Sequence, residues 1–470
     1  MNRTYIKDLV SAIGKEVSIS GWVDVRRDHG KLIFVDIRDM SGKVQAVALP
    51  SNKAAHEVAS KIRPEWVIQA TGVVNKRPEK MISKNKETGE IEPNGDIELE
   101  LKSIEVLNEA ETSPIDLHTD GREINEEVRL KYRYLDLRRP RMQKNIRLRS
   151  EFVERARQFL FTKGFTEIET PYFTSTTPEG SRDFIVPSRM YPGKFFALPQ
   201  SPQQYKQLLM TAGFEKYFQI ARCFRDEDLR ADRGFEHTQI DMEMSFVTRD
   251  EVMQLDENMI TTVAEAMGYT IKQKPFPRIP YADAMKKYGA DKFDMRTEED
   301  KKRGVLAFAW VIDFPFFEKD ADGAWTFTHN PFSMPAPEHL EWHLAGTHTR
   351  EIVTQQYDLV CNGFETGGGS IRAHRPDILK ATFRTMGYSN EQIEKDFGHM
   401  LKAFASGTPP HGGLAHGIER LMMILTGENE LREVQAFPQT SSGRTAVMDA
   451  PSEISDKQLR ELGIELRKKK

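Results

Sequence analysis

The 470-residue chain lacks the features that mark secreted, membrane-spanning or disulfide-rich proteins. It has only two cysteines, Cys223 and Cys361, which are too far apart in sequence to form a disulfide framework or a zinc motif. The first ten residues lack the apolar core of a signal peptide. The longest apolar run, residues 305–317, is interrupted by Asp313 and is too short to span a bilayer. These absences predict a cytoplasmic protein without membrane contact.

The composition is that of a globular protein with two or three domains, because 39% of the residues are hydrophobic and 29% are charged. A net charge of −4 argues against a protein that is basic throughout. Basic residues are nevertheless clustered, since nine Lys and Arg lie between Arg129 and Arg149 with only Asp136 opposing them. Such a run is either a solvated helix face or a local contact for phosphates.

Residues 1–106 have the pattern of a five-stranded β-barrel. Five short segments alternate β-branched and polar residues between turn residues, and a helical pattern over residues 52–61 lies between the third and the fourth. This order predicts an OB fold, which binds single-stranded nucleic acid through aromatic rings and a basic groove. Phe34, on the second segment, is either such a ring or a core residue. The polar stretch over residues 107–135 is predicted to be a hinge.

The stretch ARCFRDEDLRADRGFEHTQIDMEM, residues 221–244, predicts a charged β-hairpin. Apolar and polar residues alternate on both sides of a loop, which contains Arg225, Glu227, Arg230, Asp232 and Arg233. Guanidinium groups suit phosphate oxygens, and carboxylates hold Mg²⁺ or an ammonium group. The hairpin is therefore predicted to bind a polyphosphate, and the alternative is a surface hairpin with salt bridges.

Three further segments contain candidate site residues. QQYDLVCNGFETGGGSIR, residues 355–372, places Asp358 and Glu365 on an apolar strand, where a carboxylate is costly to bury unless it is paired or binds a metal. PPHGGLAHGIERLMMIL, residues 409–425, places Arg420 at the start of a helix, which favours phosphate. In ALPQSPQQYKQLLM, residues 197–210, Lys206 is either a surface residue or a buried cation with an anionic partner. A further helix is predicted to begin at Ser150 and to end before Gly164.

Together these segments resemble the class II aminoacyl-tRNA synthetases, in the form seen in bacterial aspartyl enzymes. The hairpin is similar to motif 2 of that family, TKGFTEIETPYF (residues 162–173) to motif 1, and residues 417–420 to motif 3. The resemblance implies an α+β protein and a homodimer. Its expected parts are an OB-fold anticodon-binding domain (1–106), the hinge (107–135) and a catalytic domain with an antiparallel sheet flanked by helices (136–470). Only 124 positions separate Asp241 from Glu365, so most of the large insertion domain of the family is missing and residues 275–304 are its expected remnant.

The resemblance also implies the reaction, which is ATP-dependent ligation of L-aspartate to tRNA-Asp through an aspartyl-adenylate, with ATP and Mg²⁺. The implied catalytic residues are Arg225, Glu227 and Arg420. The implied aspartate-binding residues are Glu179, Ser201, Gln203, Lys206, Arg225, Asp241, His329 and Arg372. The implied ATP-binding residues are Arg225, Asp226, Glu227, Gly234, His237, Glu365, Gly417, Ile418, Glu419 and Arg420. Asp358 and Glu365 would bind the metal, and Arg27, Phe34, Gln45 and Glu92 the anticodon.

Four positions depart from the family pattern. Gly234 replaces a Gln, His237 an adenine-stacking Phe, Asn330 a second His, and His416 an apolar residue. We expect the first two departures to weaken ATP binding, although an imidazole can still stack on a base.

The choice of substrate leaves alternatives open. His29 resembles the family members that charge both tRNA-Asp and tRNA-Asn, with a second discriminating position near Lys80 and Met81. The alternative is a solvated turn histidine in a strictly tRNA-Asp-specific enzyme. Lys206 and a second cation argue against an asparaginyl- or lysyl-type enzyme. Because the ATP-site arginines and carboxylates are present together, an OB-fold RNA-binding protein with a degenerate catalytic body is less favoured.

Overall fold

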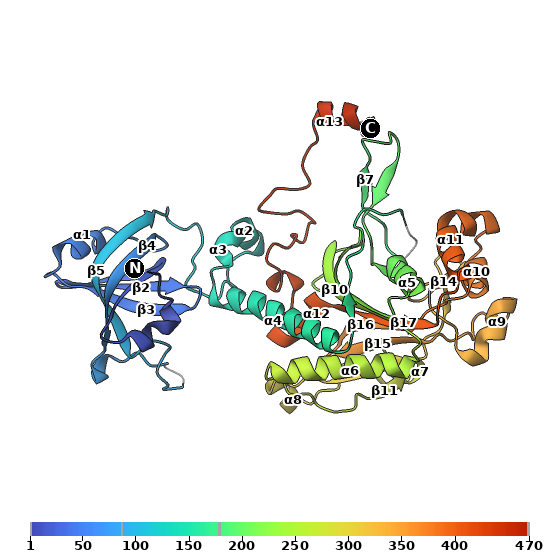
Figure 1. Ribbon diagram of the computed structural model, residues 1–470, viewed down its shortest axis with the longest axis horizontal. Coiled ribbons are helices and arrows are strands. Elements are labelled where there is room, and N and C mark those ends of the chain that lie inside the picture. The colour runs from blue at the N-terminus through green and yellow to red at the C-terminus, as the bar shows by residue number, and fades with distance from the viewer. Residues whose placement is uncertain (1, 86–87, 177–179, 468–470) are drawn as a thin grey trace. The chain divides into compact units, whose positions relative to one another are not determined.

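A computed structural model describes residues 2–85, 88–176 and 180–467, and the chain forms two compact units, Met1–Asp116 and Leu117–Lys470. The amino-terminal unit, blue in Figure 1, is a closed barrel with the strand order β1-β2-β3-β5-β4. Its elements are η1 (Ile6–Ala12), β1 (Glu16–His29), β2 (Leu32–Asp39), β3 (Gly42–Ala48), α1 (Lys53–Ala59), β4 (Val67–Lys76), η2 (Glu79–Met81) and β5 (Ile97–Asn108). The predicted five-stranded OB-fold barrel is confirmed.

The alternation along β2 explains how the barrel forms. Ile33, Val35 and Ile37 are buried in the barrel core, because every second side chain of a strand points to the same face. Phe34 is only half-buried and does not belong to that core. The core alternative for Phe34 is therefore excluded, and its ring belongs to the outer face of the barrel.

The second unit is built on an eight-stranded sheet with the order β11-β12-β15-β16-β17-β10-β9-β6. Its strands are β6 (Thr166–Glu167), β9 (Lys216–Phe224), β10 (Glu236–Ser245), β11 (Arg278–Pro280), β12 (Phe308–Ile312), β15 (Gln356–Cys361), β16 (Phe364–Ile371) and β17 (His411–Gly417). The six strands from β12 to β9 are antiparallel to their neighbours, whereas the edge pairs β11–β12 and β6–β9 are parallel. The α+β class is confirmed, with a sheet that is antiparallel at its centre and mixed at its edges.

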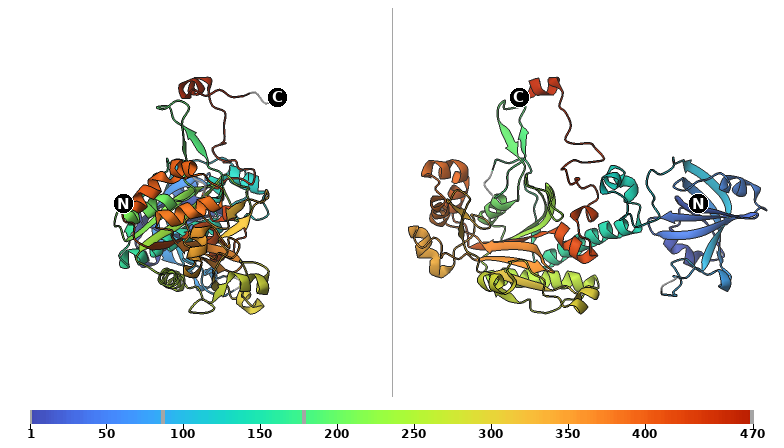
Figure 2. Two further views of the ribbon diagram at one scale, coloured as in Figure 1. Left: turned by 90° about the vertical axis from the view of Figure 1, so that its right-hand side faces the viewer. Right: turned by 180° about the vertical axis from the view of Figure 1, so that it is seen from behind.

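Most helices cover the sheet or lie around it, and the last one lies away from it (Figures 1 and 2). They are α2 (Glu126–Lys131), α3 (Arg133–Asp136), α4 (Pro140–Thr162), α5 (Gln203–Thr211), α6 (Arg249–Ala266), α7 (Tyr281–Tyr288), α8 (Glu298–Lys302), α9 (Leu340–Ala345), α10 (Pro376–Thr385), α11 (Asn390–Ala405), α12 (Ile418–Thr426) and α13 (Asp456–Leu462), with the 3₁₀ turns η3 (Pro337–His339) and η4 (Leu431–Glu433). Two hairpins complete the unit: β7 (Ile185–Pro187) with β8 (Phe195–Ala197), and β13 (Phe317–Lys319) with β14 (Trp325–Phe327). Among the described residues, no helix combines the length and the apolar character needed to cross a membrane.

One face of the sheet packs against helices, and the opposite face carries the polar residues of the candidate site. Ile240, Met242 and Met244 of β10 belong to the main hydrophobic core, together with apolar residues of α4, α6 and α12. The intervening residues Asp241 and Glu243 are buried on the opposite face of the strand. The alternation that predicted a strand therefore also separates the core side chains from the polar ones.

Helix α4 begins earlier than the sequence predicted. It starts at Pro140, which occupies the first helical position after the extended Arg139, and not at Ser150. The prediction failed because the first turns carry few apolar residues, although Met142 and Asn145 are buried there. The helix ends at Thr162, before Gly164, as predicted.

The basic run before and inside α4 is mostly an internal ion-pair network. Arg133 and Arg139 are fully buried and donate to the two carboxylate oxygens of Asp136, each at 2.7 Å. Arg129 donates to both oxygens of Glu433, at 2.5 and 3.2 Å. At these positions the run is neither a solvated helix face nor a phosphate contact, because its charges hold η4 against α2 and α3.

Candidate active site

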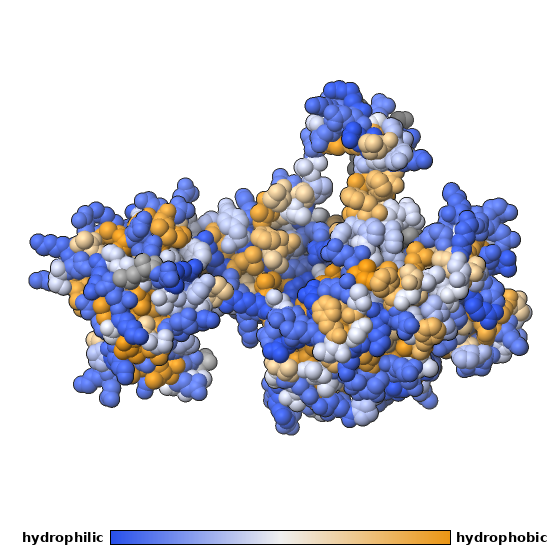
Figure 3. Space-filling view, in the orientation of Figure 1, coloured by the Kyte–Doolittle hydropathy of each residue, from blue (hydrophilic) through white to orange (hydrophobic). Residues whose placement is uncertain are grey.

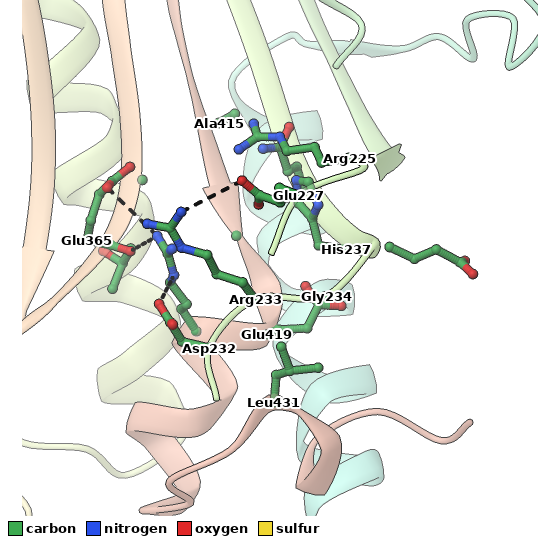
Figure 4. Close-up of a pocket in the computed structure, with 16 residues that line it drawn as sticks. Arg225, Glu227, Asp232, Arg233, Gly234, His237, Glu365, Ala415, Glu419 and Leu431 are labelled. Atoms are coloured by element: carbon green, nitrogen blue, oxygen red, sulfur yellow. Dashed lines mark hydrogen bonds and ion pairs between the residues drawn. The ribbon is translucent and has the colours of Figure 1, made fainter. Parts of the chain in front are cut away.

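Two adjoining cavities lie on the polar face of the sheet. The hairpin cavity, of about 110 Å³, is lined by Arg225, Glu227, Asp232, Arg233, Gly234, Glu236, His237, Gln239, Glu365, Thr366, Gly367, Ala415, Gly417, Glu419, Arg420 and Leu431 (Figure 4). The central cavity, of about 550 Å³, is lined among others by Ser201, Gln203, Lys206, Arg225, Asp241, His329, Asp358, Glu365 and Arg372. Both cavities share Arg225, Arg233, Gln239, Glu365 and Ala415.

Strand pairing explains why segments far apart in sequence meet here. Asp241 of β10 lies opposite Ala415 of β17, and Gly367 of β16 lies opposite His416. The glycines of β16 allow this close packing, since a Cβ at Gly369 would lie only 2.0 Å from the Gly413 carbonyl oxygen. The sheet therefore requires at least one of these glycines for packing between strands.

The guanidinium groups of the hairpin cavity differ in how closely they are paired. Arg420 Nε lies 3.2 Å from Asp232 Oδ2, and Arg233 Nη1 lies 3.7 Å from Glu227 Oε2 (Figure 4). The Nε groups of Arg225 and Arg233 are buried and have no hydrogen-bond partner among the described residues. Buried donors without partners are uncommon in folded proteins, so this cluster is suited to an anion that completes it.

His237 and Glu419 lie at the inner wall of the hairpin cavity. Burial lowers the pKa of His237 to about 3, and the charge of Arg225 acts in the same direction, so the ring is neutral at pH 7. Burial alone would raise the pKa of Glu419, but Arg149 and the Thr238 amide hold it below its ordinary value. Glu419 accepts hydrogen bonds from Thr238 N at 3.0 Å and from Arg149 at 2.9 Å, so it anchors the start of β10.

Two departures from the family pattern have simple structural explanations. A Cβ at Gly234 would stay 3.5 Å or more from its neighbours, so the cavity has room for a side chain there. His416 is fully buried, and its Nε2 lies 2.5 Å from Asp256 Oδ1 of α6. Its Nδ1 lies 3.2 Å from the Thr366 carbonyl oxygen, so this residue supports the strand that carries Glu365.

The central cavity contains a closely paired set of four charges. Lys206 donates to Asp241 Oδ2 at 2.7 Å and lies 3.2 Å from Glu243 Oε2. Arg372 donates to both oxygens of Glu243, at 2.9 and 3.2 Å. Burial alone would raise the pKa of Glu243, but Arg372 and Lys206 hold it below its ordinary value. Lys206 is therefore a buried cation with anionic partners, not a surface lysine.

Glu243 was missed by the sequence prediction, although a signal for it was present. It follows Asp241 by two residues on β10, so both side chains point to the same face. Burial raises the pKa of Asp241, and its Oδ1 has no hydrogen-bond partner among the described residues. Asp241 therefore offers an acceptor for a cationic group in the cavity.

Asp358 and Glu365 lie close enough for their charges to interact. Burial raises the pKa of Asp358 to about 7, and Glu365 adds to this rise while His329 opposes it. His329 Nδ1 lies 3.6 Å from Asp358 Oδ2. Burial would also raise the pKa of Glu365, but Lys292 and Arg420 lower it to about 2. A divalent cation would relieve the repulsion between the two carboxylates.

Lys292 is a second residue that the sequence prediction missed. Its Nζ lies 2.7 Å from Glu365 Oε2, and it lines the central cavity. No cluster of three or more His, Cys, Asp and Glu that could hold a metal ion occurs within the described ranges. The two carboxylates fit Mg²⁺ if its remaining ligands come from a bound substrate and water, as is usual for this ion.

The remaining predicted residues differ in whether they line a cavity. Asp226 lines neither of the two cavities, and Arg182 Nη2 lies 3.8 Å from its Oδ1. Ile418 is fully buried in the main core, so only its backbone is available to a ligand. Ser201 and Gln203 line the central cavity. Asn330 donates to Gln356 at 3.4 Å, and Glu179 lies outside the described residues.

On the barrel, four of the six predicted positions lie together. Arg27 donates to both oxygens of Asp36, each at 2.9 Å, and to Gln45 Oε1 at 3.4 Å. The ring centroids of His29 and Phe34 lie 5.8 Å apart in an edge-to-face arrangement. The other two positions lie in the segment that follows β4. There, Ser83 donates to Glu92 at 2.6 Å, and Met81 is 66% exposed at the end of η2.

Comparisons with known proteins agree with this geometry. Residues 125–441 match the family of class II tRNA synthetases (D, K and N), and residues 17–107 match the OB-fold nucleic acid binding domain. The chain is 39% identical to an "Aspartate--tRNA(Asp/Asn) ligase" of Rubrobacter xylanophilus, over 97% of this chain and 95% of that protein. It is also 39% identical to a protein of the same name from Syntrophomonas wolfei, over 98% of both.

Solved structures agree in fold. The asparaginyl-tRNA synthetase of Pyrococcus horikoshii superposes with a TM-score of 0.74 at 23% identity, over 94% of this chain and 98% of that one. The aspartyl-tRNA synthetase of Entamoeba histolytica gives a TM-score of 0.72 at 22% identity, over 93% and 91%. At such identities the likeness concerns the fold alone.

The alignment with the Rubrobacter protein runs over 580 positions, although the chain has 470 residues, so more than a hundred positions of that relative have no counterpart here. This difference agrees with the short spacing between Asp241 and Glu365. The matched family covers well over half of the chain, and its OB-fold partner domain covers the barrel. The chain therefore belongs to the class II tRNA synthetases of the aspartate, lysine and asparagine group.

Proposed function

We propose that this protein ligates L-aspartate to tRNA-Asp with ATP, through an aspartyl-adenylate. One observation carries the proposal, namely that Arg225 lines both cavities and has a buried Nε without a partner among the described residues. A guanidinium at such a junction can bind the α-phosphate and the attacking carboxylate at the same time. Adenylate formation needs this positioning and charge neutralisation more than it needs a nucleophilic side chain.

The hairpin cavity would bind ATP. Neutral His237 would stack on the adenine, Arg420 would hold the γ-phosphate, and Glu227 would orient the nucleotide beside Arg225. Mg²⁺, held by Glu365 and Asp358, would offset the charge of the phosphates. The cations here lie 3.2–3.7 Å from their carboxylates, whereas Lys206 and Arg372 lie 2.7–2.9 Å from theirs in the central cavity. This difference supports the assignment of the polyphosphate to the hairpin cavity.

The central cavity would bind aspartate. Asp241 and Ser201 would hold the α-amino group, and the free Oδ1 of Asp241 supports this role. Lys206 and Arg372 would bind the side-chain carboxylate, while Glu243 keeps both cations in place. Gln203 and His329 would complete the pocket. An asparagine amide would gain less from the two cations, and a lysine ammonium would be repelled, so the charges favour aspartate.

The barrel would bind the anticodon, and the second step would pass aspartate to the terminal adenosine of the tRNA in the cytoplasm. We further propose that tRNA-Asn is also charged. The contact of His29 with Phe34 supports this idea, because it places the discriminating position beside the ring that would stack on an anticodon base. Relatives at 39% identity have names that include both tRNAs. Strict tRNA-Asp specificity is the alternative.

We also propose a homodimer. The hairpin β7–β8 and the preceding segment expose many large apolar side chains, and Figure 3 shows hydrophobic surface over that hairpin. Exposed by at least 40% are Tyr172, Phe173, Ile185, Met190, Tyr191, Phe195 and Phe196. A contiguous apolar patch of this kind usually marks an interface. Light scattering should give a dimer mass that Phe195→Asp halves, whereas Met40→Asp on the barrel leaves it unchanged.

Amino-acid-dependent pyrophosphate exchange tests the reaction. We expect exchange with aspartate and little with asparagine or lysine. Activation of asparagine or lysine without activation of aspartate would refute the assignment.

Charging of transcripts tests the choice of tRNA. We expect aspartate to be attached to both tRNA-Asp and tRNA-Asn, and His29→Leu to reduce charging of tRNA-Asn more than that of tRNA-Asp. Charging of tRNA-Asp by the same variant is the internal control for folding. If the wild-type protein leaves tRNA-Asn uncharged, the strictly tRNA-Asp-specific alternative holds.

A further inference from the structure

The segment over residues 275–304, which the sequence predicts to be a remnant of the missing insertion, packs closely within the catalytic unit. Phe293 is 5% exposed and its ring stacks on Tyr288, with centroids 4.1 Å apart. The Phe293 carbonyl oxygen accepts a hydrogen bond from Gly363 N at 3.0 Å, and Arg296 pairs with Asp294 at 2.9 Å. These contacts fix the loop between α7 and α8 beside the turn that leads into β16.

This anchoring directs Lys292 to the rim of the central cavity. Its Nζ is 2.7 Å from Glu365 Oε2, and Arg420 Nη1 is 3.8 Å from the same oxygen atom. Two cations from different elements therefore converge on one carboxylate, which lines both cavities. Arg420 Nε also lies 3.2 Å from Asp232 Oδ2, so the two cations are shared between two carboxylates.

Two more cations lie at the boundary between the cavities. Arg225 and Arg233 line both of them, and each has a buried Nε without a hydrogen-bond partner among the described residues. The Lys292 side chain is 35% exposed, so it can turn from Glu365 towards a ligand without the cost of leaving a dry interior. A flexible ammonium is a point charge that suits a phosphate chain whose position changes during a reaction.

We propose that Lys292 is a phosphate-binding residue, which pairs with Glu365 in the absence of nucleotide and binds the β- and γ-phosphates of ATP and the leaving pyrophosphate. This inference rests on the proposed adenylate-forming function. Lys292 forms no covalent bond and transfers no proton in this role. If Glu365 held a divalent cation, its carboxylate would no longer need the ammonium, which would then be available to the phosphate oxygens beside Arg420. The segment that remains from the insertion thus contributes directly to the reaction.

A purely structural ion pair is the competing explanation, and the two differ in which ligands they affect. A phosphate-binding Lys292 contributes only to ligands that have β- or γ-phosphates. A lysine that merely orients Glu365 would affect ATP, AMP and aspartate to similar extents, since Glu365 lines both cavities.

Equilibrium binding measured by calorimetry, with Mg²⁺ present and without turnover, tests the proposal. For Lys292→Met we expect about tenfold weaker binding of ATP and of pyrophosphate, from the loss of one charge-assisted hydrogen bond. Binding of AMP and of aspartate should stay within about twofold of the wild-type protein. Lys292→Arg should recover part of the loss. Lys286→Met is the matched control, because Lys286 is an exposed lysine on α7 in the same segment.

Unchanged ATP binding by Lys292→Met, or equal losses for ATP, AMP and aspartate, would overturn the proposal. Melting temperatures of both variants check folding, and Lys292→Gln is a second variant with a polar side chain of similar length. A wild-type protein that binds ATP but shows no aspartate-dependent pyrophosphate exchange would refute the proposed function. The ATP and AMP measurements would still decide the role of Lys292 in that case.

Discussion

The two cavities of the catalytic unit differ in how their charges are paired. In the central cavity, Lys206, Asp241, Glu243 and Arg372 expose at most 3% of their side chains and are joined by contacts of 2.7–3.2 Å. In the hairpin cavity, Arg420 Nε lies 3.2 Å from Asp232, but the pairs Arg233–Glu227 and Arg420–Glu365 are separated by 3.7 and 3.8 Å, and the side chains are 21–35% exposed. The same residue types therefore form a rigid network in one cavity and a loose set in the other.

This difference indicates two kinds of recognition. A buried and closely paired network keeps its geometry in the absence of a ligand, so it can discriminate among small substrates by charge. Half-exposed pairs gain little from each other, so they can separate and re-form around a polyanion that enters as ATP and leaves as pyrophosphate. The contrast predicts that substitutions in the central network change stability as well as aspartate binding, whereas substitutions in the hairpin cavity mainly change activity.

The largest effect is expected for Arg225, because it serves both cavities. Arg225→Met should reduce aspartate-dependent pyrophosphate exchange by about 100- to 1000-fold, as for the loss of one preorganised donor in a transition state. The free energy of unfolding should change little, since the Nε of Arg225 has no partner to lose. Arg303→Met, at an exposed position after α8, is the control. Near-normal exchange by Arg225→Met would remove the central step of the proposed mechanism.

Glu243 tests the rigidity of the central network. Glu243→Gln leaves Arg372 and Lys206 short of one buried negative charge, so we expect a loss of about 3 kcal/mol in the free energy of unfolding. Glu227→Gln is the matched substitution in the hairpin cavity, where we expect a change of about 0.5 kcal/mol or less. Urea denaturation of both variants measures the difference. Similar losses of unfolding free energy for Glu243→Gln and Glu227→Gln would show that the two cavities do not differ in rigidity.

Asp358 gives a stability effect that depends on pH. Burial raises its pKa to about 7, so the folded protein binds this proton more tightly than the unfolded chain and loses stability as pH rises from about 4 to about 7. Asp358→Asn removes this penalty. We expect an increase on the order of 2 kcal/mol at pH 8 and little change at pH 4. Thermal unfolding at both pH values measures it, and a destabilised variant at pH 8 would contradict the assignment.

The smallest effect is expected at His237. A phenyl ring offers a larger apolar face to adenine than an imidazole, so His237→Phe should lower the KM for ATP by about threefold. The imidazole also has a pKa of about 3, so the fold loses stability as pH falls from about 6.5 to about 3. The His237→Phe variant should not show this loss of stability at low pH. An unchanged or higher KM for ATP would refute the account of this departure.

Much of the fold followed from local patterns. The barrel strands and the hairpin β9–β10 were predictable because alternation with period two depends on neighbouring residues alone. The start of α4 at Pro140 was not, because its first turns are held by buried polar contacts and not by an apolar stripe. In the same way, the basic run could not be assigned without Asp136 and Glu433, and Glu433 lies about 300 residues away.

The residues of the candidate site also differ in whether a local motif predicts them. Arg225, Glu365 and Arg420 were predicted from motifs whose residue types indicate phosphate or metal chemistry, and Asp241 and Arg372 were implied by the family resemblance. All five line the cavities. Lys292 was missed because its segment shows no such motif. Glu243 lies in the same alternation as Asp241, but the alternation alone predicts only which face of the strand it occupies and not a role in the site.

The barrel strands, the β9–β10 hairpin, the family and the charged residues of the motifs could be predicted from the sequence alone, since they depend on local order and residue type. Only the tertiary structure decided which charges meet. The register of β10 with β17 and of β16 with β17 sets which side chains share a cavity, and the packing of Phe293 directs Lys292 to Glu365. Pairing distance and burial then separate the rigid network from the loose one, because the strength of a charge interaction depends on both.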